Sequence, residues 1–331
     1  YADHQLNHGQ SVLPMFARKT REVGDMLPEL YLHGLAQGDF ELALRGLLGK
    51  GAPLSSSSIE RLRGKWQVEY EAWGKRTLTG LDVTYLWADG IYVKAGLEKE
   101  KAALLVVIGA LRDGTKEVLA IVPGYRESEE SWAEVLRDLK KRGITAPAVL
   151  CGDGNLGIWQ AVAQVWPGTK EQRCWNHKIV NVVDKVPKTA QAEVRELIKK
   201  IPYAPTKKEA VELRDQFIAR FEEDYPKATK CLENDWERMV TFYDFPLEHW
   251  KHLRTSNVVE SPFAAVRLRT DASKRFKKVQ SASALIWRLL TVGQTRFRKL
   301  NAPELLRDVH AGREFDDGVL VATRSERKAA A

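Results

Sequence analysis

The stretch LDVTYLWADGIYVKAG, residues 81–96, carries apolar and aromatic side chains at alternating positions. Side chains two residues apart lie on the same face of a β-strand, so this alternation predicts a strand. The members of the series are Val83, Tyr85, Trp87, Ile91 and Val93. Residues 103–122 then contain two apolar, β-branched runs joined at Asp113 and Gly114, which is a hairpin signature. The pattern therefore predicts three antiparallel strands.

Helix and strand patterns alternate after this predicted hairpin. Residues 128–143 are predicted to form a helix that ends at Gly143, and residues 147–151 a short buried strand. Residues 157–166 fit a second helix, and residues 171–175 fit a last strand. This order indicates an α/β fold, with one mixed sheet and helices on its faces.

Helical patterns precede the predicted sheet. Residues 38–51 place apolar side chains on one helical face, and residues 55–73 begin with a capping box formed by Ser57 and Glu60. Short helices joined by a turn rich in Gly, Pro and Ser are typical of a helix-turn-helix module that binds DNA. The outward-facing basic residues of this module would be Arg61, Arg63 and Lys65. A plain helical bundle fits the same pattern at least as well.

Helical patterns also follow the predicted sheet. Residues 187–250 are rich in Lys and Glu and lack strand runs, so they are predicted to form an all-helical insertion. A second capping box, from Thr206 to Glu209, marks the start of one of its helices. Residues 257–300 are predicted to be helical as well.

The chain is basic, because 52 Lys and Arg residues against 44 Asp and Glu residues give a formal net charge of +8. This balance favours a polyanionic partner. The sequence has no run of eighteen apolar residues and no secretory signal at its start, so neither a membrane span nor export is expected. Three widely spaced cysteines imply no disulfide framework, and we expect a reducing, cytoplasmic location.

Basic residues are concentrated between Arg267 and Lys299, where Asp271 is the one acid. A run of one sign is typical of a surface that contacts DNA phosphates, and a solvated helix face explains it about equally well. The candidate DNA-binding residues here are Arg267, Arg269, Lys274, Arg275, Lys277 and Lys278.

Two aspartates stand at positions that suit catalysis. Asp153 lies between two glycines, just after a predicted strand, where open α/β sheets bind their ligands. A helix N-cap is the ordinary role of an aspartate at such a position. Asp89 is an acid within the apolar first strand, although Asp followed by Gly is also a turn signal. Asp82, in the same stretch, is a rival candidate.

A third candidate acid is Glu260, which shares a predicted helical face with Asn257, Ala264 and Arg267. As an isolated glutamate it would ordinarily be a surface residue. Three carboxylates from separate elements can hold two divalent cations for phosphoryl transfer. Oxygen ligands without a thiolate cage favour Mg²⁺ over zinc.

Cys174 and His177 form a C-x-x-H pair, which would be half of a zinc site. No second pair of Cys or His with suitable spacing follows, so structural zinc is not expected. The sequence also lacks the G-x-x-x-x-G-K-[ST] and G-x-S-x-G motifs, which argues against a P-loop enzyme and against a serine hydrolase.

Four motifs in this order resemble those of the Mutator-type DDE transposases, in particular the bacterial insertion-sequence branch. DGIYVK (residues 89–94) is similar to the first-aspartate motif of that family, and CGDGNLGIWQAV (residues 151–162) is similar to the second. QRCWNHK (residues 172–178) resembles its C-x-x-H signature, and RTSNVVES (residues 254–261) its glutamate helix. Residues 27–49 also resemble its N-terminal helical region.

The resemblance implies an RNase H-like mixed-sheet catalytic core, which is interrupted by the helical insertion and preceded by a helical DNA-binding region. It implies that Asp89, Asp153 and Glu260 are the catalytic acids, and it favours Asp89 over Asp82. These acids are expected to bind two Mg²⁺ ions, for which Mn²⁺ substitutes, with Cys174 and His177 near the site. The expected regions are 1–77 (DNA binding), 78–178 and 253–305 (core), 179–252 (insertion) and 306–331 (C-terminal tail).

By the same resemblance, the protein is expected to bind the terminal inverted repeats of its own element, cleave the DNA ends and join the 3′-hydroxyl to target DNA. Since two DNA ends are brought together, we expect a homodimer or higher assembly on double-stranded DNA, at the bacterial nucleoid and without a membrane. Two alternatives stay open. One is an RNase H-like nuclease that cuts without joining, and the other is a non-catalytic DNA-binding regulator derived from a transposase.

Overall fold

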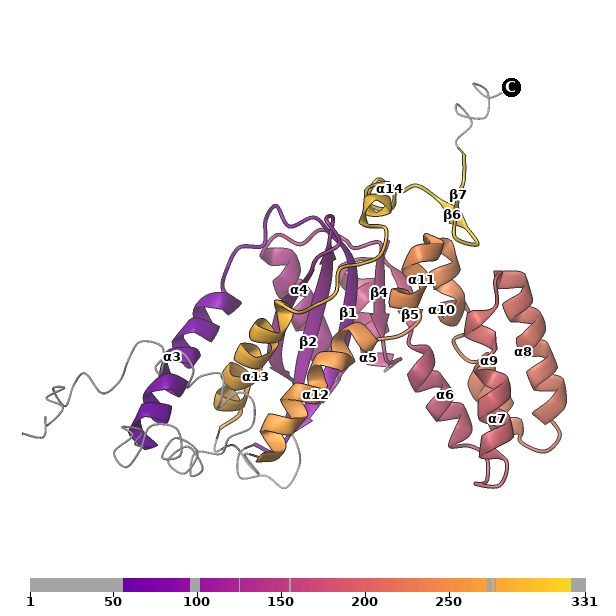
Figure 1. The fold of residues 1–331 in the computed structure, drawn as a ribbon, viewed down its shortest axis with the longest axis horizontal. Coiled ribbons are helices and arrows are strands. Elements are labelled where there is room, and N and C mark those ends of the chain that lie inside the picture. Colours follow the sequence, from indigo (N-terminus) through magenta and orange to yellow (C-terminus); the bar gives the residue numbers. More distant parts are fainter. Residues whose placement is uncertain are drawn as a thin grey trace, which may run out of the picture.

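A five-stranded mixed sheet forms the centre of the molecule (Figure 1). The computed structural model describes residues 56–95, 102–124, 126–154, 156–272, 276 and 278–322. The helices predicted between residues 26 and 51 lie outside these ranges, so the helix-turn-helix module stays a prediction. Among the described residues, no helix is long and apolar enough to cross a membrane.

The first three strands form the predicted antiparallel hairpins. They are β1 (Val83–Val93), β2 (Ala102–Leu111) and β3 (Lys116–Gly124). The turn between β2 and β3 is closed by the Asp113 carboxylate, which accepts a hydrogen bond of 2.9 Å from the backbone N–H of Thr115. Gly114 has a φ of +81°, a conformation that favours glycine. The Asp-Gly hairpin prediction is confirmed.

Two short parallel strands complete the sheet. They are β4 (Val149–Gly152), which pairs with β1, and β5 (Lys170–Arg173), which pairs with β4. The strand order is β3-β2-β1-β4-β5, so β1 lies at the centre and joins an antiparallel half to a parallel half. The predicted mixed sheet and its order of elements are confirmed.

Two helices cover one face of this sheet. α4 (Glu129–Lys141) and α5 (Leu156–Val165) connect β3 to β4 and β4 to β5, and their apolar residues pack against Leu86 and Ala88 of β1. The Ser128 side chain caps α4 by accepting a hydrogen bond from the backbone N–H of Ser131.

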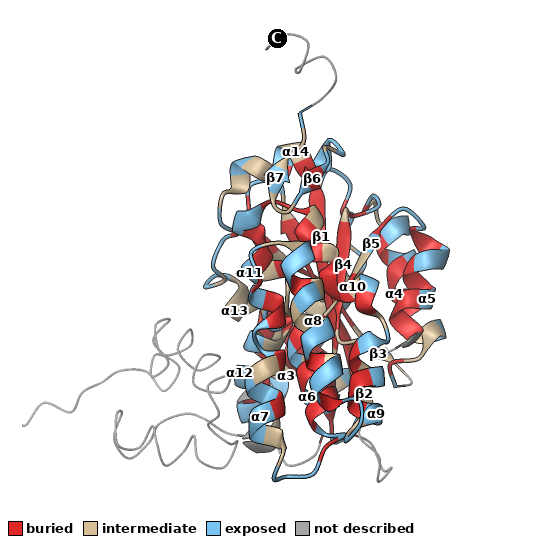
Figure 2. Cartoon of the chain, turned by 90° about the vertical axis from the view of Figure 1, so that its right-hand side faces the viewer, coloured by how far each residue is buried: buried red, intermediate tan, exposed pale blue. Residues whose placement is uncertain are grey.

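Three long helices lie on the opposite face. They are α3 (Ser56–Gly74), α12 (Asn257–Ala272) and α13 (Val279–Gln294). Trp66 of α3 is buried, and the rings of Tyr70 and Trp287 lie 6.2 Å apart between α3 and α13. Figure 2 shows the buried sheet between the α4 and α5 layer and the α12 and α13 layer. α3 begins at Ser56, so Ser57 stands within the helix and not before it as the predicted capping box required.

The predicted all-helical region lies beyond β5, at the edge of the sheet (Figure 1). Its α-helices are α6 (Trp175–Val183), α7 (Gln191–Ile198), α8 (Lys207–Phe221), α9 (Pro226–Glu233), α10 (Trp236–Val240) and α11 (Trp250–Leu253). Three 3-10 turns join them, at η1 (Ile201–Tyr203), η2 (Thr241–Asp244) and η3 (Leu247–His249). The Thr206 cap of α8 forms as predicted, and the boundaries proposed at 178 and 252 fall inside α6 and α11.

Much of the predicted C-terminal tail is packed against the rest of the protein. After η4 (Pro303–Leu305), the chain forms α14 (Leu306–His310) and a small hairpin of β6 (Phe315–Asp316) and β7 (Val319–Leu320). Leu306, Val309 and Phe315 are buried, so this segment belongs to the folded core as far as the structure describes it.

Candidate active site

Asp89 lies within the central strand β1, opposite Val106 of β2, and is only 8% exposed. One of its carboxylate oxygens accepts a hydrogen bond of 2.8 Å from the backbone N–H of Gly90. Because side chains alternate along a strand, Asp89 faces the same side as Trp87 and Ile91, which is the side of α12. It is therefore a strand residue and not a turn residue.

The strand register brings Asp153 beside Asp89. β1 and β4 run parallel, with Trp87 next to Cys151, and each aspartate follows its paired residue by two positions. β4 ends one residue before Asp153, so β4 no longer lies beside β1 at the level of the two aspartates. The site therefore lies at the carboxyl end of a parallel strand.

The turn after Asp153 depends on glycine. Gly154 has a φ of +98°, which side chains rarely tolerate. A Cβ atom at this position would also lie 2.0 Å from the Nε atom of Arg173 in β5. The glycine thus provides both the tight turn and the close packing of the arginine against it.

A third carboxylate, which the sequence analysis missed, joins the two aspartates. Glu127 lies in the connection between β3 and α4 and is 7% exposed. Asp89, Asp153 and Glu127 each offer a carboxylate oxygen, and these oxygens lie within 4.8 Å of one another. Glu127 was hidden in the sequence because it stands among several acids in residues 126–134, and periodicity does not distinguish one from another.

Burial and the neighbouring negative charges disfavour the ionised form of Asp89. Burial, followed by the charges of Asp153 and Glu127, raises the pKa of Asp89 to about 7, although the hydrogen bond from Gly90 opposes this. Buried carboxylates in such a group are costly unless positive charge is added. Their oxygens are the ligands that Mg²⁺ and Mn²⁺ prefer, so the donor set suits a hard divalent cation.

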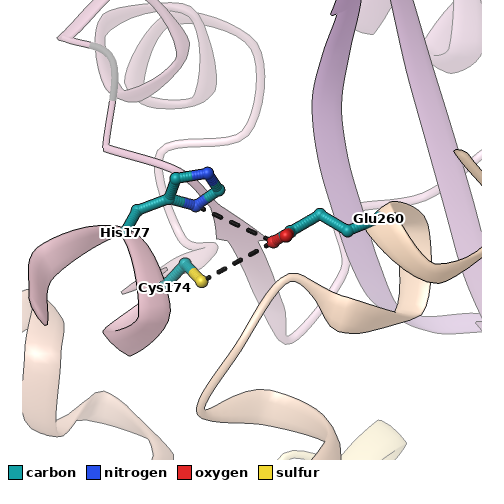
Figure 3. A group of neighbouring side chains, drawn as sticks. All are labelled: Cys174, His177 and Glu260. Carbon is teal, nitrogen blue, oxygen red and sulfur yellow. Dashed lines mark hydrogen bonds and ion pairs between the residues drawn. The ribbon is translucent and has the colours of Figure 1, made fainter. Parts of the chain in front are cut away.

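Glu260 lies in the first turn of α12 and belongs to a second group of side chains (Figure 3). Its Oε1 atom is 3.9 Å from Sγ of Cys174 and 3.7 Å from Nδ1 of His177. The same oxygen accepts a short hydrogen bond from the Ser256 hydroxyl. The structure thus brings Glu260 together with the C-x-x-H pair and not into the tight group of Asp89 and Asp153.

The C-x-x-H pair stands at the start of α6, with Cys174 fully buried and His177 partly exposed. The backbone N–H of Ser256 donates a hydrogen bond of 3.2 Å to Sγ of Cys174, which fixes the start of α12 against the start of α6. The adjacent Cys174 side chain, together with the charges of Glu260 and Asp153, raises the pKa of His177 to about 9 against the effect of burial. Since Glu260 also helps to raise the pKa of Asp89, the two groups adjoin.

Two other predicted site residues, Asp82 and Arg269, lie at the surface and in the core, respectively. Asp82 is about half exposed and forms a surface ion pair of 3.5 Å with Arg112. Arg269 is 2% exposed, because it continues the buried stripe of Val259 and Val266 on α12. The prediction of Arg269 as a DNA contact is therefore not supported by its position.

The basic residues of two distant segments share one groove. A cleft of about 350 Å³ between α3 and α13 is lined by Arg63, Trp66, Lys278 and Leu285, among others. Arg61, Lys65, Arg267 and Lys278 are exposed. The predicted DNA-binding residues Lys274, Arg275 and Lys277 lie outside the described residues.

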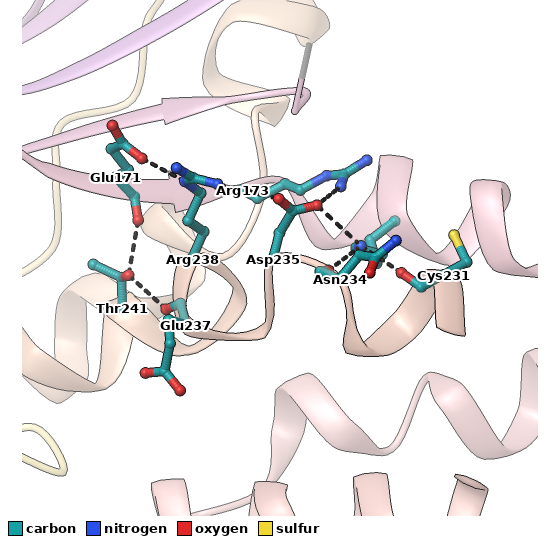
Figure 4. A network of polar contacts seen from close by, with 9 residues as sticks. Glu171, Arg173, Cys231, Asn234, Asp235, Glu237, Arg238 and Thr241 are labelled. Atoms are coloured by element: carbon teal, nitrogen blue, oxygen red, sulfur yellow. Dashed lines mark hydrogen bonds and ion pairs between the residues drawn. The ribbon is translucent and has the colours of Figure 1, made fainter. Parts of the chain in front are cut away.

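A network of buried ion pairs joins the helical region to the sheet (Figure 4). Asp235, just before α10, pairs with Arg173 of β5 and, at 3.5 Å, with Lys178 of α6. Lys178 also donates hydrogen bonds of 2.6 Å to two backbone carbonyls at the end of α9. Because Arg173 packs against Gly154, the network reaches the turn that carries Asp153.

We expect Asp89→Asn to stabilise the metal-free protein at alkaline pH. A carboxyl group whose pKa is about 3.8 in the unfolded chain and about 7 in the fold costs no stability below pH 4, where it is protonated in both states, and destabilises the fold as the pH rises. Its penalty begins near pH 4 and is complete above about pH 7. In EDTA, the variant should melt roughly 5 °C above wild type at pH 8, with a smaller difference at pH 5. Equal melting temperatures at pH 8 would show that ionising Asp89 carries no such penalty in the fold.

Carboxylates grouped beside the central strand of the sheet, in a basic protein, define a candidate metal-dependent enzyme of phosphoryl transfer. Comparison with known proteins gives the family. Residues 4–299 match the family model described as "Transposase, Mutator family". The chain therefore belongs to the Mutator family of transposases, in the branch of bacterial insertion sequences.

Curated relatives agree with this assignment. The chain is 47% identical to the transposase for insertion sequence element IS6120 of Mycolicibacterium smegmatis, over 90% of this chain and 93% of that protein. It is 37% identical to the transposase for insertion sequence element IST2 of Acidithiobacillus ferrooxidans, over 84% and 94%. It is 24% identical to the transposase for element IS256 in transposon Tn4001 of Staphylococcus aureus, over 85% and 72%.

Proposed function

We propose that this transposase binds the terminal inverted repeats of its own element, cleaves the DNA ends and joins the freed 3′-hydroxyl to target DNA. The observation that carries the proposal is the meeting of Asp89 and Asp153 across the parallel register of β1 and β4, with Glu260 of α12 in the adjoining group. These three acids come from separate elements, and carboxylates brought together in this way can hold divalent cations for phosphoryl transfer.

The fold proposed for the catalytic core is RNase H-like. The strand order β3-β2-β1-β4-β5, with one helix after β3 and another after β4, supports this proposal. The helical region between β5 and α12 is then an insertion into the core, and α12 returns the chain to the sheet with Glu260 in its first turn. The insertion therefore separates the second aspartate from the glutamate in sequence but not in space.

The residues proposed to hold two Mg²⁺ ions, or Mn²⁺ in their place, are Asp89, Asp153 and Glu260. Bound there, the cations would activate the attacking oxygen and stabilise the leaving oxygen in both in-line phosphoryl transfers. The acids position ligands and reactants and are not themselves nucleophiles. Cys174 holds the start of α12 through Ser256 and thereby orients Glu260.

The proposed DNA-contact surface includes the groove between α3 and α13, which Arg63 and Lys278 both line. Arg61, Lys65 and Arg267 extend its positive charge as exposed side chains. Contacts of this kind bind the phosphate backbone and set its position, while sequence recognition needs contacts to bases. Joining two DNA ends further implies a homodimer or higher assembly.

The test is a joining assay with a labelled duplex that carries the sequence flanking the gene. The wild-type protein is incubated with this duplex and a supercoiled plasmid, in Mg²⁺, in Mn²⁺ or in EDTA. We expect labelled plasmid to form in either metal and not in EDTA. Cleaved duplex without joined product would favour the nuclease, and binding that ignores metal, with neither reaction, would favour the regulator.

A further inference from the structure

Glu127 lies with Asp89 and Asp153 but is not among the three acids, Asp89, Asp153 and Glu260, proposed above as metal ligands. It is one of four glutamates in residues 126–134, and it is the one that is turned into the protein, where 7% of it is exposed. Glu130, three residues later, is exposed at the surface. A carboxylate is costly to bury beside two others, so its inward position needs an explanation.

The molecule leaves space for this carboxylate in the strand that carries Asp89. A Cβ atom at Gly90 would lie 2.3 Å from Oε1 of Glu127 and 2.6 Å from its Cδ. Any other residue at position 90 would therefore displace the carboxylate from the two aspartates. The absence of a side chain at Gly90 therefore allows Glu127 to approach β1 closely.

The backbone of the same segment is held from the other side by α5. A Cβ atom at Gly157 would lie 2.8 Å from the carbonyl oxygen of Glu127 and 2.6 Å from the backbone nitrogen of Glu129. Because these are backbone atoms, they cannot give way easily. The segment is thus packed between the strand of Asp89 and the helix that follows Asp153.

Glutamine at position 127 would keep the shape of the side chain and remove its charge. The Tyr92 hydroxyl hydrogen-bonds the Glu127 side chain, and a neutral glutamine would accept the same bond. The negative charge instead raises the pKa values of Tyr92 and Asp89, after the larger effect of burial on both. In the metal-free protein, the charge of Glu127 therefore adds to the cost of ionising Asp89.

We propose that Glu127 is a fourth metal-ligating acid, which shares one divalent cation with Asp89 and Asp153, while Glu260 serves the adjoining position beside Cys174 and His177. The proposal rests on the proposed metal-dependent function and adds a ligand that the three-acid site lacks. It follows from the grouping of the oxygens, since those of Glu127, Asp89 and Asp153 lie within 4.8 Å of one another.

The test measures Mn²⁺ binding to the full chain by calorimetry, without DNA. Glu127→Gln should weaken the tighter Mn²⁺ site at least about tenfold, because the site loses a charged ligand. Glu130→Gln removes the same charge from the exposed neighbour and should bind Mn²⁺ as wild type does. The melting temperature of Glu127→Gln in EDTA should equal or exceed that of wild type, which shows that the variant is folded.

Strand joining provides a second readout. The Mn²⁺ concentration needed for half-maximal joining should rise in Glu127→Gln by the same factor as the dissociation constant. Unchanged Mn²⁺ affinity in Glu127→Gln, with lost affinity in Asp153→Asn, would overturn this inference and leave the proposed function intact. If wild type itself bound no Mn²⁺, both proposals would fail.

Discussion

Asp153→Asn is expected to lower the yield of joined DNA at least about a thousandfold, because it removes a charged group from the proposed metal site. Its carboxylate lies with those of Asp89 and Glu127, just beyond the point where β4 ends beside β1. Asparagine has nearly the same shape, and the turn itself depends on Gly154 and Arg173, so the fold should be retained. Affinity for the DNA ends should stay within about twofold, since phosphate contacts dominate binding.

Asp82→Asn is the matched control for this experiment. It makes the same chemical change at an exposed aspartate next to β1, where the carboxylate pairs with Arg112 at the surface. Joining is measured with the labelled duplex and plasmid, and binding is measured by anisotropy of the same duplex. If Asp153→Asn joined DNA as well as Asp82→Asn does, Asp153 would be no more than a residue preceding a helix.

Asp235→Asn is expected to lower the free energy of unfolding by about 3 kcal/mol, because it leaves buried cations without their counter-charge. The side chains of Lys178 and Arg173 are 1% and 11% exposed, and both pair with Asp235. Asp235 has a φ of +65°, which asparagine also tolerates, so the substitution changes the charge without adding backbone strain. Guanidinium unfolding followed by fluorescence measures the difference.

Asp215→Asn serves as the control, because Asp215 pairs with Arg214 at the surface and is 58% exposed. Its free energy of unfolding should stay within about 1 kcal/mol of wild type, as is usual for exposed pairs. Equal stability of the two variants would mean that the Asp235 network does not hold the helical region to the sheet. A loss confined to Asp235→Asn should also reduce joining, since Arg173 supports the turn after Asp153.

The secondary structure of the sheet could be predicted because it depends on local patterns. Alternation along residues 81–96 placed β1, and the Asp-Gly pair at residues 113 and 114 placed the following turn. The caps at Ser128 and Thr206 act within three residues of their own helices. The helix start at Ser56 shows the usual limit of such signals, which is a shift of a residue or two at helix ends.

The candidate acids were predicted from the sequence less completely than the strands of the sheet were. Asp89, Asp153 and Glu260 were chosen from their motifs, and Glu127 was missed because its neighbours are acids too. Arg269 was counted with a basic run, yet α12 turns it into the core. Neither error could be avoided by composition, because burial depends on which face of an element meets the rest of the molecule.

The sequence by itself determined the order of strands and helices, the positive charge of the chain and the presence of one acid within a strand and another directly after a strand. These properties follow from periodicity and residue chemistry within short segments. Only the tertiary structure decided that Asp153 lies beside Asp89, that Glu127 joins them, and that Glu260 faces Cys174 and His177. The reason is that parallel register and packing between distant segments are set by long-range contacts, which no local pattern encodes.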